Sequence, residues 1–422
     1  MKYCIVIGDG MADHPVAELG GRTPLEAADI PVMDGLAAQG AIGLARTVPL
    51  ELPAGSDTAI LSICGYDPRL YYTGRAPLEA AGADVPLEGG DVAYRCNMVT
   101  LEDGDMSYAQ KRLLSHNGGS VDGESSMRLA GDLSADPAFA ARAAEYGVKI
   151  YPTPSFRHIA VQRGADIAGF TAAPPHDHLD ERINRILPSG GPAEGLNELM
   201  RLAHEFLDKH PINEARRAAG KLPANGIWFW AEGTVTALPS FASAFGKSGF
   251  VVSAVPLVWG IGALAGLDRV KVPGATGELN TDFEGKADAA LRGLAEGYDF
   301  ALLHLEAPDE CTHVGDLKGK LQAIEWLDSR MISRLKAGLE RAGEPYRLLI
   351  ISDHLTLTET RGHNGDPVPF ILYDSRRAGQ TPGGRAAAGF SEPACAAAGL
   401  FVGEGHTMIA ALLNDAGGPI PG

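Results

Sequence analysis

Short apolar runs bounded by Gly, Pro or Asp recur along the chain, and stretches with helical periodicity separate them. Near-continuous apolar runs are typical of strands buried on both faces of a parallel sheet. The runs that we predict to be strands are 3–7, 250–255, 300–305, 347–351 and 369–373. The intervening helices are predicted over 31–39, 285–296 and 321–342. This alternation predicts an α/β protein with a mostly parallel central sheet flanked by helices.

The pattern changes in the middle of the chain. A Gly- and Ser-rich stretch at 116–120, the pair Pro174-Pro175 and the run 189–192 mark loops between helical segments. We therefore predict a smaller inserted α/β domain over 116–222, with hinges near residues 116 and 223. The core domain is then discontinuous, formed by 1–115 and 223–422.

Charge limits the classes of partner. The 422 residues carry 36 Lys and Arg against 53 Asp and Glu, a net charge of −17. An acidic protein repels phosphate backbones and anionic lipid, so we expect no nucleic-acid partner and no membrane surface. An anionic substrate would need a local cationic site, built from metal ions or clustered arginines. The oligomeric state does not follow from the sequence.

Cysteine usage and hydropathy bear on the compartment. The five cysteines are scattered, odd in number and form no C-x-x-C, which argues against a disulfide framework and a zinc–thiolate site. The N-terminal apolar run is too short for a signal peptide, and no apolar stretch reaches the ~20 residues of a membrane span. We expect a cytoplasmic protein with reduced thiols.

Metal-binding residue types follow three of the predicted strands. They are Asp9 after 3–7, the segment 306–313 after 300–305, and Asp353 with His354 after 347–351. In parallel α/β sheets, ligands bind beyond the carboxyl ends of strands, so these side chains are expected at one edge. His363 precedes the predicted strand 369–373 and supplies a further imidazole.

Each piece alone has an ordinary explanation. An Asp after a strand is most often a helix cap, and a D-x-x-x-H pair is usually a surface ion pair. However, Asp309 and His313 share one face if a helix begins there, as chelating pairs do. Together, at successive strand ends, these residues predict a metal site.

Ser56 supports two interpretations. Gly55-Ser56 precedes an apolar periodic stretch, so Ser56 is a natural helix N-cap. Alternatively, backbone N–H groups at the helix start hold a phosphate, and a neighbouring cation lowers the hydroxyl pKa to make a nucleophile. The predicted metal ligands favour the nucleophile.

Several residues are candidates for binding substrate oxyanions or for acid/base work: Arg75, Arg95, Arg157, His158, His176 and Asp177. Arginine suits bidentate recognition of phosphate and carboxylate, although each one alone fits a surface or structural role. His176-Asp177 fits an acid/base pair or a simple turn. Two other enzyme classes are disfavoured: 260–265 matches G-x-G-x-x-A without the acidic residue of a dinucleotide site, and no G-x-S-x-G elbow occurs.

Several short segments of the sequence resemble those of a known protein family. They are Asp9-Gly10, Gly55-Ser56-Asp57, Ala307-Pro308-Asp309-Glu310 with His313, Ser352-Asp353-His354, and His363 with Asp366-Pro367-Val368-Pro369-Phe370. The chain resembles the alkaline phosphatase superfamily and, within it, the cofactor-independent phosphoglycerate mutases of the archaeal type. The similarity runs almost end to end and is weakest between about 105 and 225.

The resemblance implies an alkaline-phosphatase-like core with a two-metal centre. Asp309, His313 and His363 would hold one divalent ion, and Asp9, Ser56, Asp353 and His354 would hold the other. Mn²⁺ is the first expectation, with Mg²⁺, Co²⁺ or Zn²⁺ as alternatives. Ser56 would receive the phosphoryl group from the 3-hydroxyl of glycerate and return it to the 2-hydroxyl. The inserted domain would be a lid that clamps the small phosphorylated hydroxy acid.

Some positions depart from the family pattern. Leu355-Thr356-Leu357 stands where the family commonly has Pro-Thr-Pro, Ala231 where relatives often have Gly, and 116–120 differs from the common version. None removes a ligand, but the lid and clamp set the substrate. A related metal-dependent phosphotransferase such as a homoserine kinase, a phosphatase and an inactive binding protein therefore stay open as alternatives.

Overall fold

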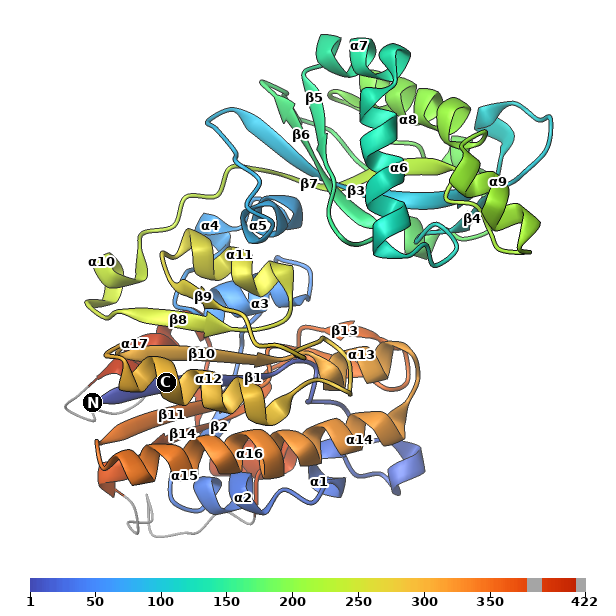
Figure 1. The fold of residues 1–422 in the computed structure, drawn as a ribbon. Coiled ribbons are helices and arrows are strands. Elements are labelled where there is room, and N and C mark those ends of the chain that lie inside the picture. The colour runs from blue at the N-terminus through green and yellow to red at the C-terminus, as the bar shows by residue number, and fades with distance from the viewer. Residues whose placement is uncertain (378–388, 415–422) are drawn as a thin grey trace. The chain divides into compact units, whose positions relative to one another are not determined.

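The computed structural model describes residues 1–377 and 389–414. The chain forms two compact units, Met1–Tyr72 with Ala237–Gly422 and Thr73–Thr236 (Figure 1). The second unit is wider than the insert expected at 116–222. It takes in 73–115 and 223–236 as well, because two strands from those segments, β3 (Asp91–Leu101) and β7 (Gly226–Thr234), pair with each other inside it. The Gly- and Ser-rich stretch at 116–120 is a loop within this unit.

The first unit is built on one large sheet. Among the described residues it has eight strands, in the order β15-β2-β14-β11-β1-β10-β8-β9. Their bounds are β1 Lys2–Gly8, β2 Ala41–Ala45, β8 Gly249–Val252, β9 Asp268–Val270, β10 Phe300–Leu305, β11 Tyr346–Ile351, β14 Val368–Asp374 and β15 Phe401–Val402. The strands β11, β1, β10, β8 and β9 are mutually parallel. Within the described sheet, only β14 runs antiparallel to its neighbours, β11 and β2.

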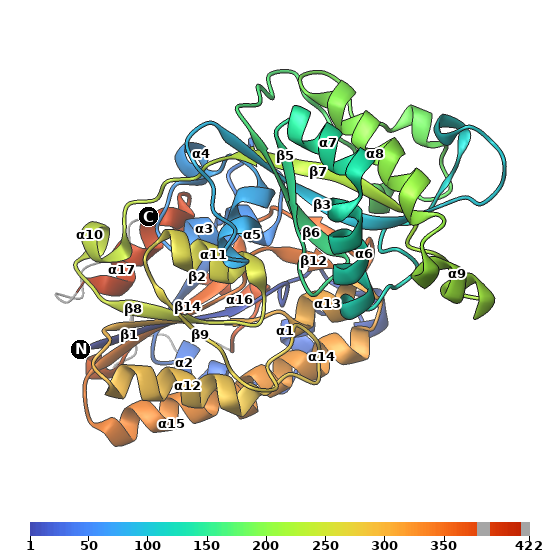
Figure 2. The same ribbon diagram turned by 45° about the horizontal axis from the view of Figure 1, so that its top comes forward.

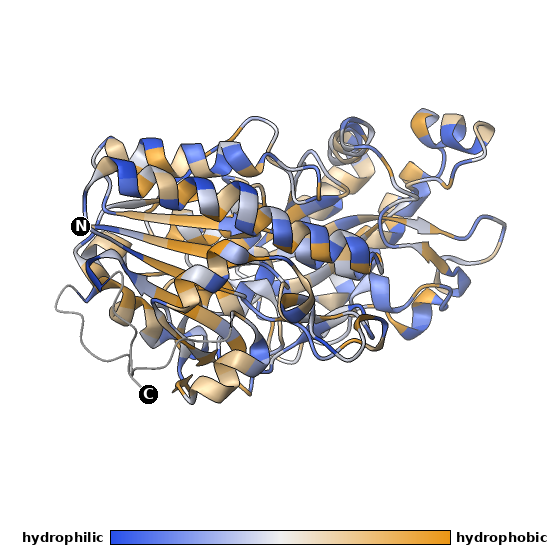
Figure 3. Cartoon of the chain, turned by 90° about the horizontal axis from the view of Figure 1, so that it is seen from below, coloured by the Kyte–Doolittle hydropathy of each residue, from blue (hydrophilic) through white to orange (hydrophobic). Residues whose placement is uncertain are grey.

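Helices cover both faces of this sheet (Figures 1 and 2). On one face lie α2 (Pro31–Ala37), α12 (Phe283–Ala295), α14 (Leu317–Trp326), α15 (Ser333–Ala342) and α16 (Glu392–Ala398). Alternate residues of β1, Cys4 and Val6, belong to the core beneath these helices. On the other face lie α3 (Ser56–Ile63) and α11 (Pro256–Leu264). Because helices bury both faces of the sheet, its strands are almost wholly apolar, as the hydropathy colouring shows (Figure 3).

Shorter elements complete the first unit: α1 Pro24–Ala27, α4 Pro68–Tyr71, α10 Phe241–Phe245, α13 Ala307–His313, α17 Met408–Leu413, and the hairpin of β12 (Leu355–Leu357) and β13 (Gly362–Asn364). Among the described residues, no helix is both long and apolar enough to cross a membrane.

The structure confirms the predicted α/β class and shifts some element boundaries. The strand expected over 250–255 ends at Val252, because Pro256 opens α11 and the residue before it is extended. The helix expected over 321–342 is one continuous run, but a π-helical segment at Leu327–Ile332 divides it into α14 and α15. Asp328 in that segment accepts hydrogen bonds from the backbone N–H groups of Val32 and Met33 at the start of α2.

The second unit is an antiparallel sheet with helices on both faces. Its strands are β3, β4 (Leu113–Ser115), β5 (Val148–Tyr151), β6 (Arg157–Arg163) and β7. Its helices are α5 Arg75–Gly82, α6 Gly123–Ala135, α7 Pro137–Glu145, α8 Ala193–Leu207 and α9 Pro211–Ala218. Neighbouring residues of β3 belong to different cores: Ala93 packs with α5, whereas Val92 and Tyr94 pack with α6, α7 and α8. The two faces of this sheet are therefore chemically distinct.

Candidate active site

The topology of the first unit gathers polar residues at one edge of its sheet. The carboxyl ends of β11, β1 and β10 are adjacent, so Asp353, Asp9 and Asp309 all follow strands that end side by side. Because β14 runs the other way, the residues before it lie at the same edge, and these include His363 on β13. The sequence order gives no hint of this reversal.

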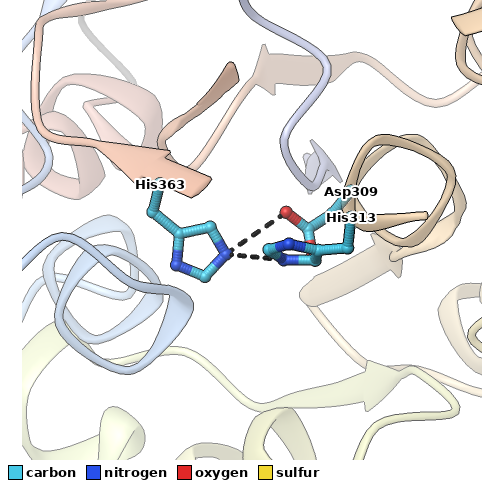
Figure 4. A group of neighbouring side chains, drawn as sticks. All are labelled: Asp309, His313 and His363. Atoms are coloured by element: carbon cyan, nitrogen blue, oxygen red, sulfur yellow. Dashed lines mark hydrogen bonds and ion pairs between the residues drawn. The ribbon is translucent and has the colours of Figure 1, made fainter. Parts of the chain in front are cut away.

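The first group of side chains is Asp309, His313 and His363 (Figure 4). Nε2 of His313 lies 3.1 Å from Oδ2 of Asp309, and Nε2 of His363 lies 3.4 Å from Oδ1. The two Nε2 atoms are 3.0 Å apart. Asp309 and His313 do share one face of a short helix, α13, as the four-residue spacing predicted.

Hydrogen bonding fixes the direction of one imidazole in this group. Nδ1 of His313 lies 2.8 Å from the carbonyl oxygen of Arg361 and must donate to it, since a carbonyl only accepts. The other ring nitrogen, Nε2, therefore faces Asp309 and His363. Burial alone would raise the pKa of Asp309, but hydrogen bonds with the two histidines hold it well below its usual range. The hydrogen bond with Asp309 raises the pKa of His313 to about 9.

The second group is Asp9, Ser56, Asp353 and His354. Ser56 Oγ lies 3.2 Å from Oδ2 of Asp9 and 3.2 Å from Nε2 of His354. The same Nε2 atom is 3.2 Å from Oδ2 of Asp353 and 3.6 Å from Oδ1 of Asp9. Asp9, Asp353 and His354 are fully buried, and Ser56 is 8% exposed. The two groups adjoin, because the rings of His354 and His363 are 4.1 Å apart.

The chemistry of the second group fits a bound cation. Oδ1 of Asp9 and Oδ2 of Asp353 are buried and accept no hydrogen bond from any described residue. Leaving buried carboxylate oxygens unpaired is costly unless a cation meets them. Burial, and then repulsion from Asp353, Glu306 and Asp309, raises the pKa of Asp9 well above its ordinary value. Four carboxylates this close to one another require compensating positive charge.

Ser56 is not the cap of its helix. Gly55 occupies the N-cap position of α3 and makes no side-chain cap hydrogen bond, and Ser56 is the first helical residue. The hydroxyl instead faces Asp9 and His354. The N–H of Thr58 donates to Oδ1 of Asp57 at 3.0 Å, which leaves the N–H groups of Ser56 and Asp57 for an anion, as the second interpretation of the sequence required.

Three further polar residues lie at this edge that the sequence did not identify as site residues. His304 Nε2 lies 2.9 Å from Oδ2 of Asp9, and Glu306 lies 3.5 Å from the same nitrogen. Thr356 donates to Oδ1 of Asp309 at 2.6 Å. The position of His304 inside the apolar run 300–305 could have identified it, because a buried strand rarely carries an imidazole without a partner.

The predicted arginines lie in the second unit, on the face of the sheet covered by α5. Arg95 on β3 is 4% exposed, and its Nε donates to Oε2 of Glu79 at 2.7 Å. Nε of Arg75 donates to the other oxygen of Glu79 at 3.0 Å. The Arg95 guanidinium lies over the ring of Trp230, 4.8 Å from its centroid. Exposed Arg157 faces the same group closely enough to lower the pKa of Glu79.

The two predicted His positions of this unit differ. The exposed ring of His176 packs edge-on against Trp230 at 5.3 Å, so His176 belongs with the arginines, and exposed Asp177 follows it. His158 faces the other core: it is fully buried, one nitrogen lies 3.1 Å from Ser126 Oγ, and the other accepts from the N–H of Thr153. His158 therefore faces away from the arginines, because adjacent strand residues point to opposite faces, and its role in substrate binding stays a prediction.

Comparison with known proteins agrees with this geometry. Residues 37–213 match the family model of the 2,3-bisphosphoglycerate-independent phosphoglycerate mutases. A mutase of that name from Methanosarcina acetivorans is 44% identical over 88% of this chain and 90% of its own. A solved protein from Pyrococcus horikoshii has a TM-score of 0.76 at 31% identity, covering 98% of this chain and 97% of its own. The cofactor-independent phosphoglycerate mutase of Thermoplasma acidophilum has a TM-score of 0.57 at 26% identity, covering 97% and 98%. With identities this high over almost the whole length of both proteins, the chain belongs to the 2,3-bisphosphoglycerate-independent phosphoglycerate mutase family.

Proposed function

We propose that this chain is an isomerase that interconverts 3-phosphoglycerate and 2-phosphoglycerate without 2,3-bisphosphoglycerate, through a phosphoserine at Ser56. The observation that carries the proposal is the environment of Ser56 Oγ, which lies 3.2 Å from both Asp9 and His354 at an uncapped helix start. A serine used only to begin a helix would turn its oxygen back to the backbone.

The proposed reaction has two balanced halves. Ser56 Oγ attacks phosphorus, the Oγ–P bond forms, and the bond from phosphorus to the C3 oxygen breaks. The hydroxyl hydrogen of Ser56 points at Oδ2 of Asp9, so this oxygen is the first acceptor of the proton that the C3 oxygen finally takes up. In the second half the C2 oxygen attacks phosphorus, the bond from phosphorus to the C2 oxygen forms, and the Oγ–P bond breaks. The proton of the C2 hydroxyl returns to Ser56. The N–H groups at the start of α3 stabilise the phosphoryl oxygens in both halves.

We further propose that the two groups at the sheet edge each hold one divalent ion. Asp309, His313 and His363 form one ligand set, and Asp9, Ser56, Asp353 and His354 form the other. When bound, such ions lower the pKa of the serine hydroxyl and neutralise charge on the transferring phosphoryl group. The mixed carboxylate, imidazole and hydroxyl ligands suit Mn²⁺ first, and also Mg²⁺, Co²⁺ or Zn²⁺.

The second unit is proposed to clamp the substrate and to act as a lid. Arg75, Arg95, Arg157 and His176 offer donors for the carboxylate and phosphate of phosphoglycerate, with Asp177 beside them. Glu79 holds two of the arginines in place, and Trp230 supports Arg95 from below its guanidinium plane. A clamp of this kind would also exclude water, which would otherwise hydrolyse the phosphoserine.

The test is an enolase-coupled assay of the purified chain. We expect 2-phosphoglycerate to form from 3-phosphoglycerate with Mn²⁺ present and with neither 2,3-bisphosphoglycerate nor ATP. Inorganic phosphate is measured in the same samples, and homoserine with ATP is tested separately. Release of phosphate in place of isomerisation would indicate a phosphatase, and phosphorylation of homoserine a kinase; either result without mutase turnover would contradict the proposal.

A further inference from the structure

His304 occupies an unusual place for an imidazole. It lies inside β10, in the parallel part of the sheet, and is fully buried. Its neighbours Leu303 and Leu305 face the core beneath α12, so His304 faces the opposite side with Leu302. An imidazole buried this deeply must satisfy both of its ring nitrogens inside the protein.

Both nitrogens of His304 have partners. Nδ1 lies 3.2 Å from Ser253 Oγ, and Nε2 lies 2.9 Å from Oδ2 of Asp9. Ser253 Oγ already accepts from the N–H of Val255 at 3.0 Å, so its own hydrogen is available for Nδ1. Once Nδ1 accepts from Ser253, the ring hydrogen lies on Nε2, which donates it to Oδ2 of Asp9. Ser253 thus donates a hydrogen bond to His304, and His304 donates one to Asp9.

These hydrogen bonds leave one particular oxygen of Asp9 free to bind a cation. Oδ2 accepts from His304 and from Ser56, whereas the buried Oδ1 accepts from no described residue. Lys286, itself 1% exposed, donates to the backbone oxygen of His304 at 3.1 Å and fixes the end of the strand. Because the imidazole is held on both sides, its hydrogen bond to Oδ2 restricts rotation of the Asp9 carboxylate.

We infer that His304, oriented by Ser253, is a positioning residue that presents Oδ1 of Asp9 to the divalent ion. This inference rests on the proposed metal role of Asp9. Groups that hydrogen-bond a metal ligand from behind typically contribute 10–100-fold to metal affinity. His304 itself touches neither substrate nor metal in this scheme, so its effect is on metal affinity and not on the chemical step.

The test is a Mn²⁺ titration of the full chain after removal of metal, following free Mn²⁺ by electron paramagnetic resonance. We expect His304→Leu to weaken one of the two Mn²⁺ equivalents by about 10–100-fold. His304→Gln retains an N–H donor near the Nε2 position and should recover most of the affinity. Ser253→Ala, which loses the group that fixes the tautomer, should show a smaller loss of the same equivalent. At saturating Mn²⁺, kcat of His304→Gln should return to within a few-fold of the parent.

Leu302→Val is the matched control, because Leu302 is fully buried on the same face of the same strand. It should lower thermal stability and leave both Mn²⁺ equivalents unchanged. The inference is overturned if His304→Leu and Ser253→Ala both bind Mn²⁺ like the parent, or if His304→Gln binds no better than His304→Leu. Since the titration uses no substrate, a parent that binds two Mn²⁺ but does not isomerise phosphoglycerate would contradict the proposed function alone.

Discussion

Ser56 shows how one position changes the interpretation of a residue. As a helix cap its oxygen would accept from a backbone N–H two or three residues later. As the first residue of α3 it projects from the helix start to Asp9 and His354. A shift of one residue in the start of α3 would therefore change the role of Ser56 from chemical to structural.

Ser56→Ala tests that difference. We expect at least ~10³-fold loss of mutase turnover, on the order of 4 kcal/mol of transition-state stabilisation. The free energy of unfolding should change little, because no cap is lost. Ser240→Ala is the control, since Ser240 does cap α10 and accepts from the N–H of Ser243. It should cost about 1 kcal/mol in urea unfolding and leave turnover intact. Near-parent turnover of Ser56→Ala would exclude the phosphoserine route.

Ala231 carries backbone strain. Its φ is +53°, in the left-handed region that favours glycine, at a register shift between β3 and β7. We expect Ala231→Gly to stabilise the second unit by about 1 kcal/mol, because strain of about 1–2 kcal/mol is relieved against a smaller entropic cost. Ala160→Gly, on the regular strand β6, should destabilise instead. Equal effects of the two substitutions in chemical denaturation would contradict this account.

At the scale of elements, Glu79 links α5 to β3. Burial alone would raise its pKa, but Arg95 and Arg75 outweigh burial and hold the pKa of Glu79 well below its usual range. A depressed carboxylate pKa stabilises the fold above the ordinary value and loses that contribution as pH falls. We therefore expect the second unit to lose stability as pH drops below about 4.5, toward the depressed pKa.

Glu79→Gln should reveal this contribution. It leaves Arg95 buried without its charge partner, so we expect a loss of about 3–5 kcal/mol at pH 7 and a weaker dependence on acid. Glu198→Gln, which removes an ion pair with Arg142 at the surface, is the control and should cost at most about 1 kcal/mol. Urea unfolding at pH 7 and pH 4 measures both. An unchanged acid profile in Glu79→Gln would show that other carboxylates set it.

At the scale of the whole molecule the net charge is −17, and four of the carboxylates that contribute to it are neighbours at the sheet edge. Removal of divalent ions should abolish mutase turnover, and Mn²⁺ should restore it. At 100 times its dissociation constant, one bound ion adds about 2.7 kcal/mol to the folded state, so the unfolding temperature should rise by several degrees. NaCl at matched ionic strength should not reproduce that rise; if it does, the effect is screening and not site binding.

Much of the fold followed from local pattern. The run 300–305 is β10 residue for residue, and the apolar runs near 3–7, 347–351 and 369–373 are strands extended by a residue or two. A strand covered on both faces accommodates a polar side chain only where that side chain has a partner or a function. Continuous apolar runs therefore identify such strands. The pairing of Asp309 with His313 likewise followed from helical spacing alone.

Other features depended on partners far away in the sequence. The reversal of β14, which puts His363 beside Asp309, is set by strand pairing. The π-helical turn at Asp328 meets the start of α2, almost 300 residues earlier. The wider second unit depends on the pairing of β3 with β7.

The sequence by itself determined the α/β class, the strand ends that carry Asp9, Asp309 and Asp353, and Ser56 as one of two alternatives, because each follows from periodicity or adjacency along the chain. Tertiary structure alone decided that Ser56 faces Asp9, that His158 is turned away from Arg95, and that His304 stands behind Asp9. Those outcomes depend on strand order, register and the face of each sheet, which are set when distant segments pack together.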